Sequence, residues 1–348
     1  RISTAMKTVF SPLHHRRTVK SELDGGILVD PYEKPSRAET ILARVIHQKL
    51  GDVIEPEEFG LDPILRIHGA DYVDFLKQCW DEWTAAGKPG EAIPAIWAGR
   101  GMRHREPKDI DGRLGYFSFS AESSITEGTW DAAYASAQVA LTAQKRVASG
   151  DRAAFALCRP PGHHAASDMY GGYCFFNNAA ISAQAFLDQG AQRVAILDVD
   201  FHHGNGTQSI FYDRNDVLTI SLHGDPDFAF PHFLGFEDET GEGKGEGYNL
   251  NIAYPPNTPF SVWQEGLEKA CREIERYAPD AIIVALGVDT FEGDPISFFK
   301  LTSADYLTMG QRIASLNLPT LFTMEGGYDV DAIGINAVNV LEGFESNQ

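Results

Sequence analysis

The sequence predicts an α/β fold in which a mostly parallel sheet is covered by helices on both faces. Two observations support this prediction. Short apolar runs rich in β-branched residues alternate with longer amphipathic stretches, and polar residues directly follow several of the short runs. The runs expected to form strands are 153–157, 194–197, 217–222, 281–286 and 320–324. The stretches with helical periodicity are 37–50, 71–86, 129–148, 178–188, 262–277 and 303–315.

The chain is expected to form one domain over residues 1–348, because no repeat or low-complexity linker divides it. Residues 6–10, MKTVF, look like a native beginning that runs into a first strand, so residues 1–5 are expected to be a cloning remnant. Residues 89–128, rich in Gly, Arg, Asp and Ser, have no persistent period. Long insertions of this kind are usually either functional or disordered, and composition leaves both open.

Composition excludes several classes of protein. The chain has no apolar stretch near the roughly 20 residues that a membrane-spanning helix needs, and no secretory signal at its start. We therefore expect a cytoplasmic protein without a membrane partner. The net charge of −20 opposes binding to nucleic acid and favours attraction of cations. Acidic surfaces are also often only solubilising.

The four cysteines, Cys79, Cys158, Cys174 and Cys271, are scattered without a CxxC pair. This spacing argues against a disulfide framework and against a thiolate zinc site, so we expect reduced, buried thiols. The sequence also lacks a GxSxG nucleophile elbow and a Walker phosphate loop.

Four polar clusters follow four of the expected strands. They are CRPPGHH at 158–164, DVDFHHGN at 198–205, Asp289, and EGGY at 325–328. In open α/β sheets, ligands bind beyond the carboxyl ends of the strands. The four clusters therefore predict one common site.

The second and third clusters contain candidate metal ligands. In an extended segment Asp198, Asp200 and His202 point to the same side, because side chains alternate with a period of two. Asp200 and His202 could bind one metal, with Asp289 as a third ligand, and such a set leaves a coordination position open for substrate. Each residue alone would more often cap a helix or form an ordinary hydrogen bond. Three crowded acidic groups, however, would repel one another without a cation or proton.

The first and fourth clusters contain candidate acid–base and oxyanion groups. His163 and His164 follow Pro-Pro-Gly, a stiff turn that can aim both imidazoles, and histidine suits proton transfer near neutral pH. Surface pairs and metal-binding pairs of histidines are the alternatives. Tyr328 follows two glycines, so its phenol could approach a ligand and donate to a developing oxyanion. A turn with a packed aromatic ring is the simpler interpretation of that motif.

Six ordered blocks together resemble the signature of the histone deacetylase and acetylpolyamine amidohydrolase family. They are RPPGHHA at 159–165, GGYCFFNN at 171–178, DVDFHHGNGTQ at 198–208, SLHGD at 221–225, GVDTFEGDP at 287–295 and EGGY at 325–328. The resemblance spans nearly the whole chain. It implies a three-layer arginase/deacetylase-type fold with about eight strands, and a metal-dependent amidohydrolase that releases acetate from an acetylated amine.

The resemblance also implies roles for individual residues. Zn²⁺, or alternatively Fe²⁺, would be bound by Asp200, His202 and Asp289. The general base and later acid would be His164, with electrostatic help from His163, and Tyr328 would polarise the carbonyl. The histidines would be oriented by Asp198 and Asn205; Asn205 stands where some relatives have Asp, so the proton affinity of its histidine would differ.

Further implied roles concern the substrate and a second ion. Tyr173 and Phe230 would form the aromatic walls of the substrate tunnel, and the carbonyl of Gly172 would face the amide nitrogen. Structural K⁺ would be bound by Asp198, Asp200, His202, Ser221 and Leu222.

The subfamily is indicated by residues 100–122, within the 89–128 insertion. With Asp109, Asp111 and Glu122, this segment resembles the insertion that builds a dimer and narrows the active-site mouth in acetylpolyamine amidohydrolases. We therefore expect a homodimer and a small cationic acetylated amine, contacted by Glu122 and Asp111, although Asp111 stands where relatives carry Glu. The alternatives are an acetyl-lysine protein deacetylase and, from another class, a non-catalytic acetyl-amine-binding or acetoin-utilisation-type protein.

Overall fold

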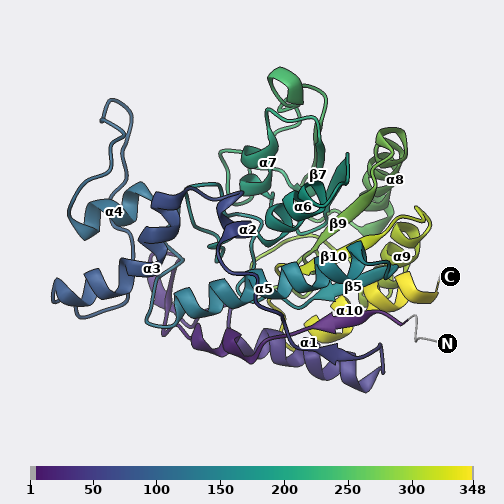
Figure 1. Ribbon diagram of the computed structural model, residues 1–348, viewed down its shortest axis with the longest axis horizontal. Coiled ribbons are helices and arrows are strands. Elements are labelled where there is room, and N and C mark those ends of the chain that lie inside the picture. Colours follow the sequence, from purple (N-terminus) through teal and green to yellow (C-terminus); the bar gives the residue numbers. More distant parts are fainter. Residues whose placement is uncertain (1–4, 347–348) are drawn as a thin grey trace.

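The computed structural model describes residues 5–346, and one eight-stranded sheet forms its centre (Figure 1). The strand order is β4-β1-β5-β10-β9-β6-β7-β8, and all neighbouring strands are parallel. Their bounds are β1 (Lys7–Val9), β4 (Val53–Ile54), β5 (Ala153–Ala156), β6 (Val194–Asp198), β7 (Val217–Gly224), β8 (Asn249–Tyr254), β9 (Ala281–Leu286) and β10 (Thr320–Met324). This confirms the expected α/β fold and all five expected strands. The proposed remnant at 1–5 lies, apart from Ala5, outside the described residues.

Helices cover both faces of the sheet, because alternate side chains of each strand point to opposite sides. In β9, Ile283 belongs to one apolar cluster and Ile282 to the other. The first cluster includes buried residues of α2 (Asp62–Leu65), α3 (Ala70–Ala85), α5 (Thr129–Ala148) and α6 (Asn178–Asp188). The second includes those of α1 (Pro35–His47), α8 (Phe260–Tyr277), α9 (Ser303–Ala314) and α10 (Ile333–Ser346). A strand buried on both faces has a continuous apolar sequence, which is why β5, β6, β7, β9 and β10 could be predicted.

A small antiparallel hairpin lies outside the main sheet. It joins β2 (Glu22–Asp24) to β3 (Ile27–Val29) through Gly25 and Gly26, whose φ values are +60° and +80°. Glycine enters this left-handed region without steric penalty, so the Gly-Gly pair permits the tight turn. The remaining elements are η1 (Pro12–Arg16), α4 (Ile110–Tyr116), α7 (Asn205–Phe211) and η2 (Gly243–Gly245).

The 89–128 insertion is more regular than its composition indicated. Ala92 and Ile125 pair across its base, with backbone hydrogen bonds of 3.0 and 2.9 Å. Helix α4 lies within it, and Arg113 of α4 forms ion pairs with Glu82 and Glu106. A loop beside α4 projects from the body of the molecule (Figure 1).

No helix within residues 5–346 is long and apolar enough to cross a membrane. All four cysteines are free and buried, as expected.

The four strands that carry the polar clusters are consecutive in the sheet, in the order β5-β10-β9-β6. Asp198, at the end of β6, stands opposite Ala285 of β9, and Leu286 of β9 stands opposite Met324 of β10. Because the strands are parallel, their carboxyl ends meet at one edge. The four clusters are therefore brought together, as the sequence predicted.

Candidate active site

The candidate metal ligands Asp200, His202 and Asp289 are buried, and one ligand atom from each lies within 4.8 Å of the others. Backbone amides fix both carboxylates: Gly326 N donates to Asp200 Oδ2 at 2.8 Å, and Phe201 N donates to Asp289 Oδ1 at 2.7 Å. His202 Nδ1 lies 2.9 Å from Asp289 Oδ2. A side chain at position 326 would collide with this cluster, since a Cβ there would lie 2.7 Å from Asp200 Oδ2 and 2.8 Å from Asp289 Oδ2.

The charges of this cluster fit a divalent cation. Burial, and next the neighbouring Asp200, raise the pKa of Asp289 to about 7. Burial alone would lower the pKa of His202, but its hydrogen bonds to Asp200 and Asp289 raise it to about 10. Two carboxylates are thus buried close together beside one imidazole, and a bound cation would relieve the repulsion between them. Two carboxylates and one imidazole suit Zn²⁺ or Fe²⁺.

The tandem histidines have different partners. His163 Nδ1 lies 2.7 Å from Asp198 Oδ2, whereas His164 Nδ1 lies 2.6 Å from the amide oxygen of Asn205. Asn205 Nδ2 also donates to the His164 carbonyl at 3.4 Å, which fixes the direction of the amide. His164 therefore carries its proton on Nδ1 and leaves Nε2 free to accept one.

The electrostatic environment separates the two imidazoles further. Burial works to lower the pKa of His163, but the Asp198, Asp200 and Glu325 carboxylates raise it well above its usual value. Burial and the neighbouring His163 hold the pKa of His164 well below its usual value. The pair thus consists of one imidazolium and one neutral base. Pairs of titratable groups with divergent pKa values are typical of acid–base sites.

Two buried charged residues hold the turns that carry these groups. Glu325 Oε2 accepts hydrogen bonds from the backbone N–H groups of Gly162 (2.8 Å) and His163 (3.1 Å). Arg37 donates to the carbonyls of Gly327 (2.6 Å) and Glu325 (2.7 Å). Neither residue was assigned a role from the sequence, because each acts on a segment more than 150 positions away.

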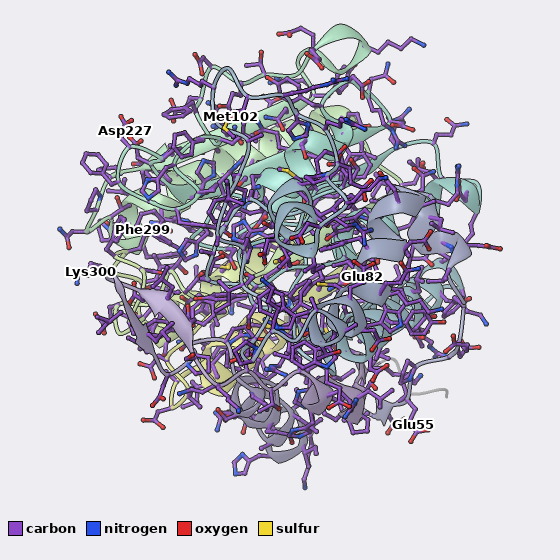
Figure 2. All side chains as sticks on the ribbon, turned by 90° about the vertical axis from the view of Figure 1, so that its left-hand side faces the viewer. Glu55, Glu82, Met102, Asp227, Phe299 and Lys300 are labelled. Carbon is purple, nitrogen blue, oxygen red and sulfur yellow. The ribbon has the colours of Figure 1, made fainter. Side chains whose placement is uncertain are left out.

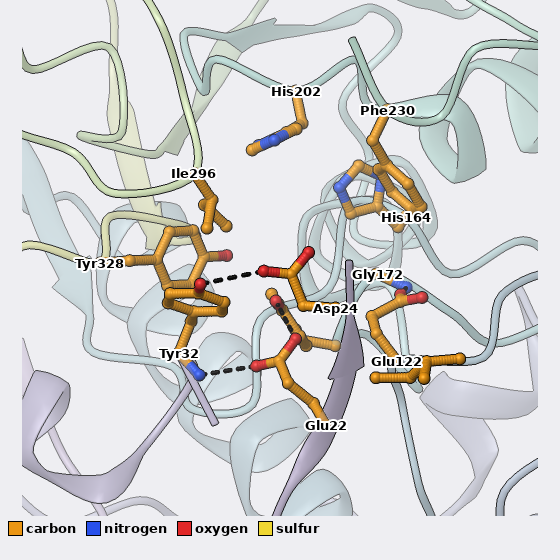
Figure 3. Close-up of a pocket in the computed structure, with 12 residues that line it drawn as sticks. Glu22, Asp24, Tyr32, Glu122, His164, Gly172, His202, Phe230, Ile296 and Tyr328 are labelled. Atoms are coloured by element: carbon orange, nitrogen blue, oxygen red, sulfur yellow. Dashed lines mark hydrogen bonds between the residues drawn. The ribbon is translucent and has the colours of Figure 1, made fainter. Parts of the chain in front are cut away.

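Tyr328 presents a neutral phenol to the site. Burial raises its pKa well above the usual value, although the Arg37 guanidinium, 4.8 Å from the ring centroid, opposes this shift. Its backbone N–H donates to Asp294 Oδ2 at 2.9 Å. The hydroxyl forms no hydrogen bond with another described residue, and it points into the cavity (Figure 3). It is therefore free to donate to a ligand.

Three of these groups, His164, His202 and Tyr328, line one cavity of about 230 Å³. Its lining combines catalytic candidates, an aromatic and aliphatic wall, and three carboxylates (Figure 3). The first group is His164, His202 and Tyr328, the second includes Tyr173, Phe230 and Ile296, and the third is Glu22, Asp24 and Glu122.

The expected tunnel residues Gly172, Tyr173 and Phe230 all line the cavity. The ring centroid of Phe230 lies 5.2 Å from that of His164 in an edge-to-face contact, and the rings of Tyr173 and Tyr328 are 5.6 Å apart. Gly172 has φ +56°, and a Cβ there would lie 2.3 Å from the His164 ring. Only glycine fits this position. Glu122 Oε1 accepts the Gly172 N–H at 2.6 Å, so Glu122 also supports the tunnel wall.

The hairpin residues of the cavity were missed in the sequence. Tyr173 Oη donates to Glu22 Oε2 at 2.8 Å, and Tyr32 N donates to Glu22 Oε1 at 2.6 Å. Tyr32 Oη donates to Asp24 Oδ2 at 3.0 Å. The Gly25-Gly26 pair was a signal for a hairpin. Nothing local to it, however, indicated a contact with Tyr173, about 150 residues away.

Asp111 does not line the cavity of the single chain. Its Oδ2 accepts a hydrogen bond from Lys88 Nζ at 2.9 Å, and Asp109 caps α4 by accepting from the Asp111 N–H at 2.9 Å. Both carboxylates are therefore engaged locally.

The residues expected to bind K⁺ include two members of the metal cluster, Asp200 and His202, together with Asp198, Ser221 and Leu222. Asp198 and Ser221 are opposite each other in the β6–β7 register and line a small pocket of about 10 Å³. Ser221 Oγ also lies 2.8 Å from His223 Nδ1. The roles of Asp200, His202 and Leu222 toward this ion stay a prediction.

Comparisons with known proteins agree with this geometry. Residues 31–344 match the histone deacetylase domain. The chain is 58% identical to acetylpolyamine amidohydrolase 1 of Pseudomonas aeruginosa, covering 98% of this chain and 99% of that protein. It is 54% identical to the acetylpolyamine amidohydrolase of Mycoplana ramosa, with 97% and 99% covered. The crystal structure of an acetylpolyamine aminohydrolase from Burkholderia pseudomallei superposes with a TM-score of 0.94 at 38% identity, covering 99% of both chains. The chain is an amidohydrolase with the arginase/deacetylase fold, and it belongs to the histone deacetylase family.

Proposed function

We propose that this enzyme hydrolyses the acetamide bond of acetylated polyamines, or of related small cationic acetylated amines, and that it depends on zinc. The observation that carries the proposal is the cavity itself. The neutral imidazole of His164, the free phenol of Tyr328 and the candidate ligand His202 line it, and His202 is grouped with Asp200 and Asp289. Three carboxylates also line the cavity, and no Lys or Arg of the described chain does. Such a lining favours a substrate with one acetamide end and one positive end.

Asp200, His202 and Asp289 would hold the zinc ion. When bound, zinc supplies a Lewis acid that polarises the acetyl carbonyl and makes water more acidic. The backbone N–H groups of Gly326 and Phe201 keep both carboxylates oriented for this task. Such partners are part of a metal site's design.

Proton transfer would belong to His164. Its free Nε2 accepts a proton from the attacking water, and the same proton then passes to the amine nitrogen as the C–N bond breaks. His163, charged and anchored on Asp198, stabilises negative charge near the reacting carbon. Tyr328 donates to the oxygen of the former carbonyl as it becomes an oxyanion. The products are acetate and a free amine.

The proposal extends to the substrate's charged end. The relatives of 58% and 54% identity are named for acetylpolyamines. Glu122 lines the cavity, and we propose that it attracts the distal ammonium. Asp111 could act there only in an assembly that brings it to a cavity, because within one chain it pairs with Lys88.

We also propose a homodimer formed through the insertion. The loop 95–109 is exposed throughout, and it carries Ile96, Trp97 and Met102 at its surface. Figure 2 looks toward the side on which this loop projects, with Met102 labelled. Four basic residues lie within it: Arg100, Arg103, Arg105 and Lys108. A basic loop with apolar contacts, on a chain of net charge −20, complements the acidic surface of a second copy.

Two further proposals concern the environment of the enzyme. K⁺ would stabilise the segment around Asp198 and Ser221, where both residues line a small pocket. Cytoplasmic residence would keep the four free cysteines reduced.

The decisive experiment is a comparison of turnover by the zinc-loaded enzyme. Acetylputrescine, acetylcadaverine, acetylspermidine and an acetyl-lysine peptide would be tested side by side, with acetate release as the readout. We expect the acetylated polyamines to have the highest kcat/KM. A higher value for the peptide would favour the protein deacetylase alternative, and no acetate from any substrate would favour the non-catalytic binding protein.

A further inference from the structure

The β2–β3 hairpin contributes two carboxylates to the cavity, and they have different surroundings. Glu22 is 4% exposed and both of its oxygens accept hydrogen bonds, one from Tyr32 N and one from Tyr173 Oη. Asp24 is exposed to the cavity, and only its Oδ2 is engaged, by Tyr32 Oη. Its Oδ1 has no hydrogen-bond partner, and the carboxylate no ion pair, among the described residues.

The geometry of a strand explains why Asp24 faces the substrate space. Residues i and i+2 of a strand share a face, so Glu22 and Asp24 point to the same side of β2. The hydrogen bond from Tyr173 to Glu22 holds this face of β2 against the tunnel wall. Asp24 is therefore directed into the cavity, where Figure 3 shows its carboxylate between Tyr328 and His164.

The charge of Asp24 is the least compensated one in the cavity lining. Glu122 Oε1 receives donors from Ser120 Oγ, Ser123 Oγ and Gly172 N, so hydrogen bonds already support that carboxylate. Asp24 has one phenolic donor and a free oxygen. A charged group left with unused acceptor capacity beside a substrate space is suited to a ligand that brings a positive charge and N–H donors.

We propose that Asp24 is a specificity-determining residue that binds the ammonium group of the substrate through its free Oδ1, while Glu22 and Tyr32 hold the hairpin in place. This inference rests on the proposed function, since it concerns the charged end of the same substrate. It assigns the selection of charge to the N-terminal hairpin in addition to the insertion. Deacetylation of an uncharged acetamide does not require it.

The test compares two substrates of equal length, N-acetyl-1,4-diaminobutane and N-pentylacetamide, which differ only in the terminal ammonium. Asp24→Asn removes the charge but keeps an oxygen that can accept from Tyr32. We expect the ratio of kcat/KM on the charged to the neutral substrate to fall about twofold to fivefold, the range for a solvent-accessible charge pair. The loss should shrink as salt rises. Asp24→Glu should restore most of the ratio.

The matched control is Asp81→Asn, which removes one exposed carboxylate of α3. It changes the net charge equally, so an equal fall in the ratio for both variants would show a general field and overturn the inference. An unchanged ratio of kcat/KM on the charged to the neutral substrate in Asp24→Asn would also overturn the inference. In that case, turnover of the charged substrate would still support the proposed function.

A binding measurement tests the role of Asp24 independently of the proposed function. Calorimetric titration of 1,4-diaminobutane into the zinc-loaded protein requires no catalysis, and we expect weaker binding to Asp24→Asn than to wild type and Asp81→Asn. If wild type deacetylates neither substrate, the proposed function fails, and this titration alone decides the role of Asp24. Equal affinity in all three proteins would then reject it.

Discussion

The Nδ1–H of His164 donates to the amide oxygen of Asn205 at 2.6 Å, while the adjacent His163 faces the carboxylate of Asp198 at 2.7 Å. An amide orients an imidazole without stabilising its protonated form as strongly as a carboxylate does. The hydrogen-bond partners Asp198 and Asn205 therefore decide which histidine is charged and which acts as a base.

Replacing Asn205 with Asp should raise the pKa of His164. Because the base must be neutral to accept a proton, the acid limb of the kcat/KM profile should move to higher pH in this variant. The measurement is kcat/KM across pH for wild type and Asn205→Asp. The control is Asn215→Asp. Asn215 is exposed and precedes the amino-terminal end of β7, on the side of the sheet away from the site, so this variant should leave the acid limb in place. An acid limb that moved to lower pH, or not at all, would contradict the assignment of His164.

Removing a metal ligand should abolish metal retention and activity together. Asp289→Ala and Asp200→Ala each take away one of three ligands and leave an uncompensated carboxylate nearby. Elemental analysis of purified protein should show zinc in wild type and in the exposed-surface control Asp331→Ala, but not in either ligand variant. Asp289→Asn, which preserves shape, guards against loss through misfolding. Full zinc occupancy in folded Asp289→Asn and Asp200→Asn would rule out the ligand assignment.

Tyr328→Phe should keep zinc and fold but lower kcat by roughly 100-fold, the usual effect of losing one oxyanion donor. The hydroxyl has no described protein partner, so its removal breaks no internal hydrogen bond. Tyr277→Phe is the control, because Tyr277 Oη donates to the Asn215 carbonyl at 2.8 Å, far from the carboxyl ends of the strands. We expect Tyr277→Phe to lower the unfolding midpoint slightly and to leave kcat unchanged. If Tyr328→Phe behaved like this control, the phenol would be a packing group.

The inner site could be predicted because its chemistry is local to strand ends. Asp198 ends β6, and the bend that carries Asp200 and His202 follows it directly. Parallel strands bring their carboxyl ends to one edge regardless of their order. The strand order itself, which makes β5, β10, β9 and β6 neighbours, depends on crossovers that no local pattern encodes. Strand β8 was missed because its buried Asn249 and Asn251 bond to Gln208, so it does not read as an apolar run.

The outer cavity was harder to predict, since its geometry depends on long-range contacts. Glu22 and Asp24 reach the cavity through a hydrogen bond to Tyr173, about 150 residues away. Asp111 looked like a substrate contact, yet the start of α4 turns it toward Lys88. Asp109 and Asp111 lie at the start of α4, whereas the exposed loop 95–109 has four Lys or Arg residues against two carboxylates, Glu106 and Asp109.

The basic residues of the loop 95–109 allow a test of whether the insertion forms the dimer. Replacing residues 99–104 with two glycines removes Arg100, Met102 and Arg103 but keeps the Arg113–Glu106 ion pair and the Ala92–Ile125 bridge. The pocket wall built by Glu122 and Gly172 should therefore survive. We expect wild type to be a dimer and the shortened variant a monomer by light scattering, because the loop is shortened and loses one apolar and two basic side chains.

The same variant should also lose selectivity. Without a partner to narrow the mouth, its kcat/KM on an acetyl-lysine peptide should rise relative to that on acetylputrescine. Glu122→Gln, with an intact loop, is the matched comparison: it should remain a dimer and lose more activity on acetylputrescine than on N-pentylacetamide, by roughly 1 kcal/mol at low salt. If the shortened variant stayed dimeric and its ratio of kcat/KM on the peptide to that on acetylputrescine did not change, the insertion would have no role in dimer formation or in substrate selection. That result would not affect the proposed catalytic roles of the inner-site residues.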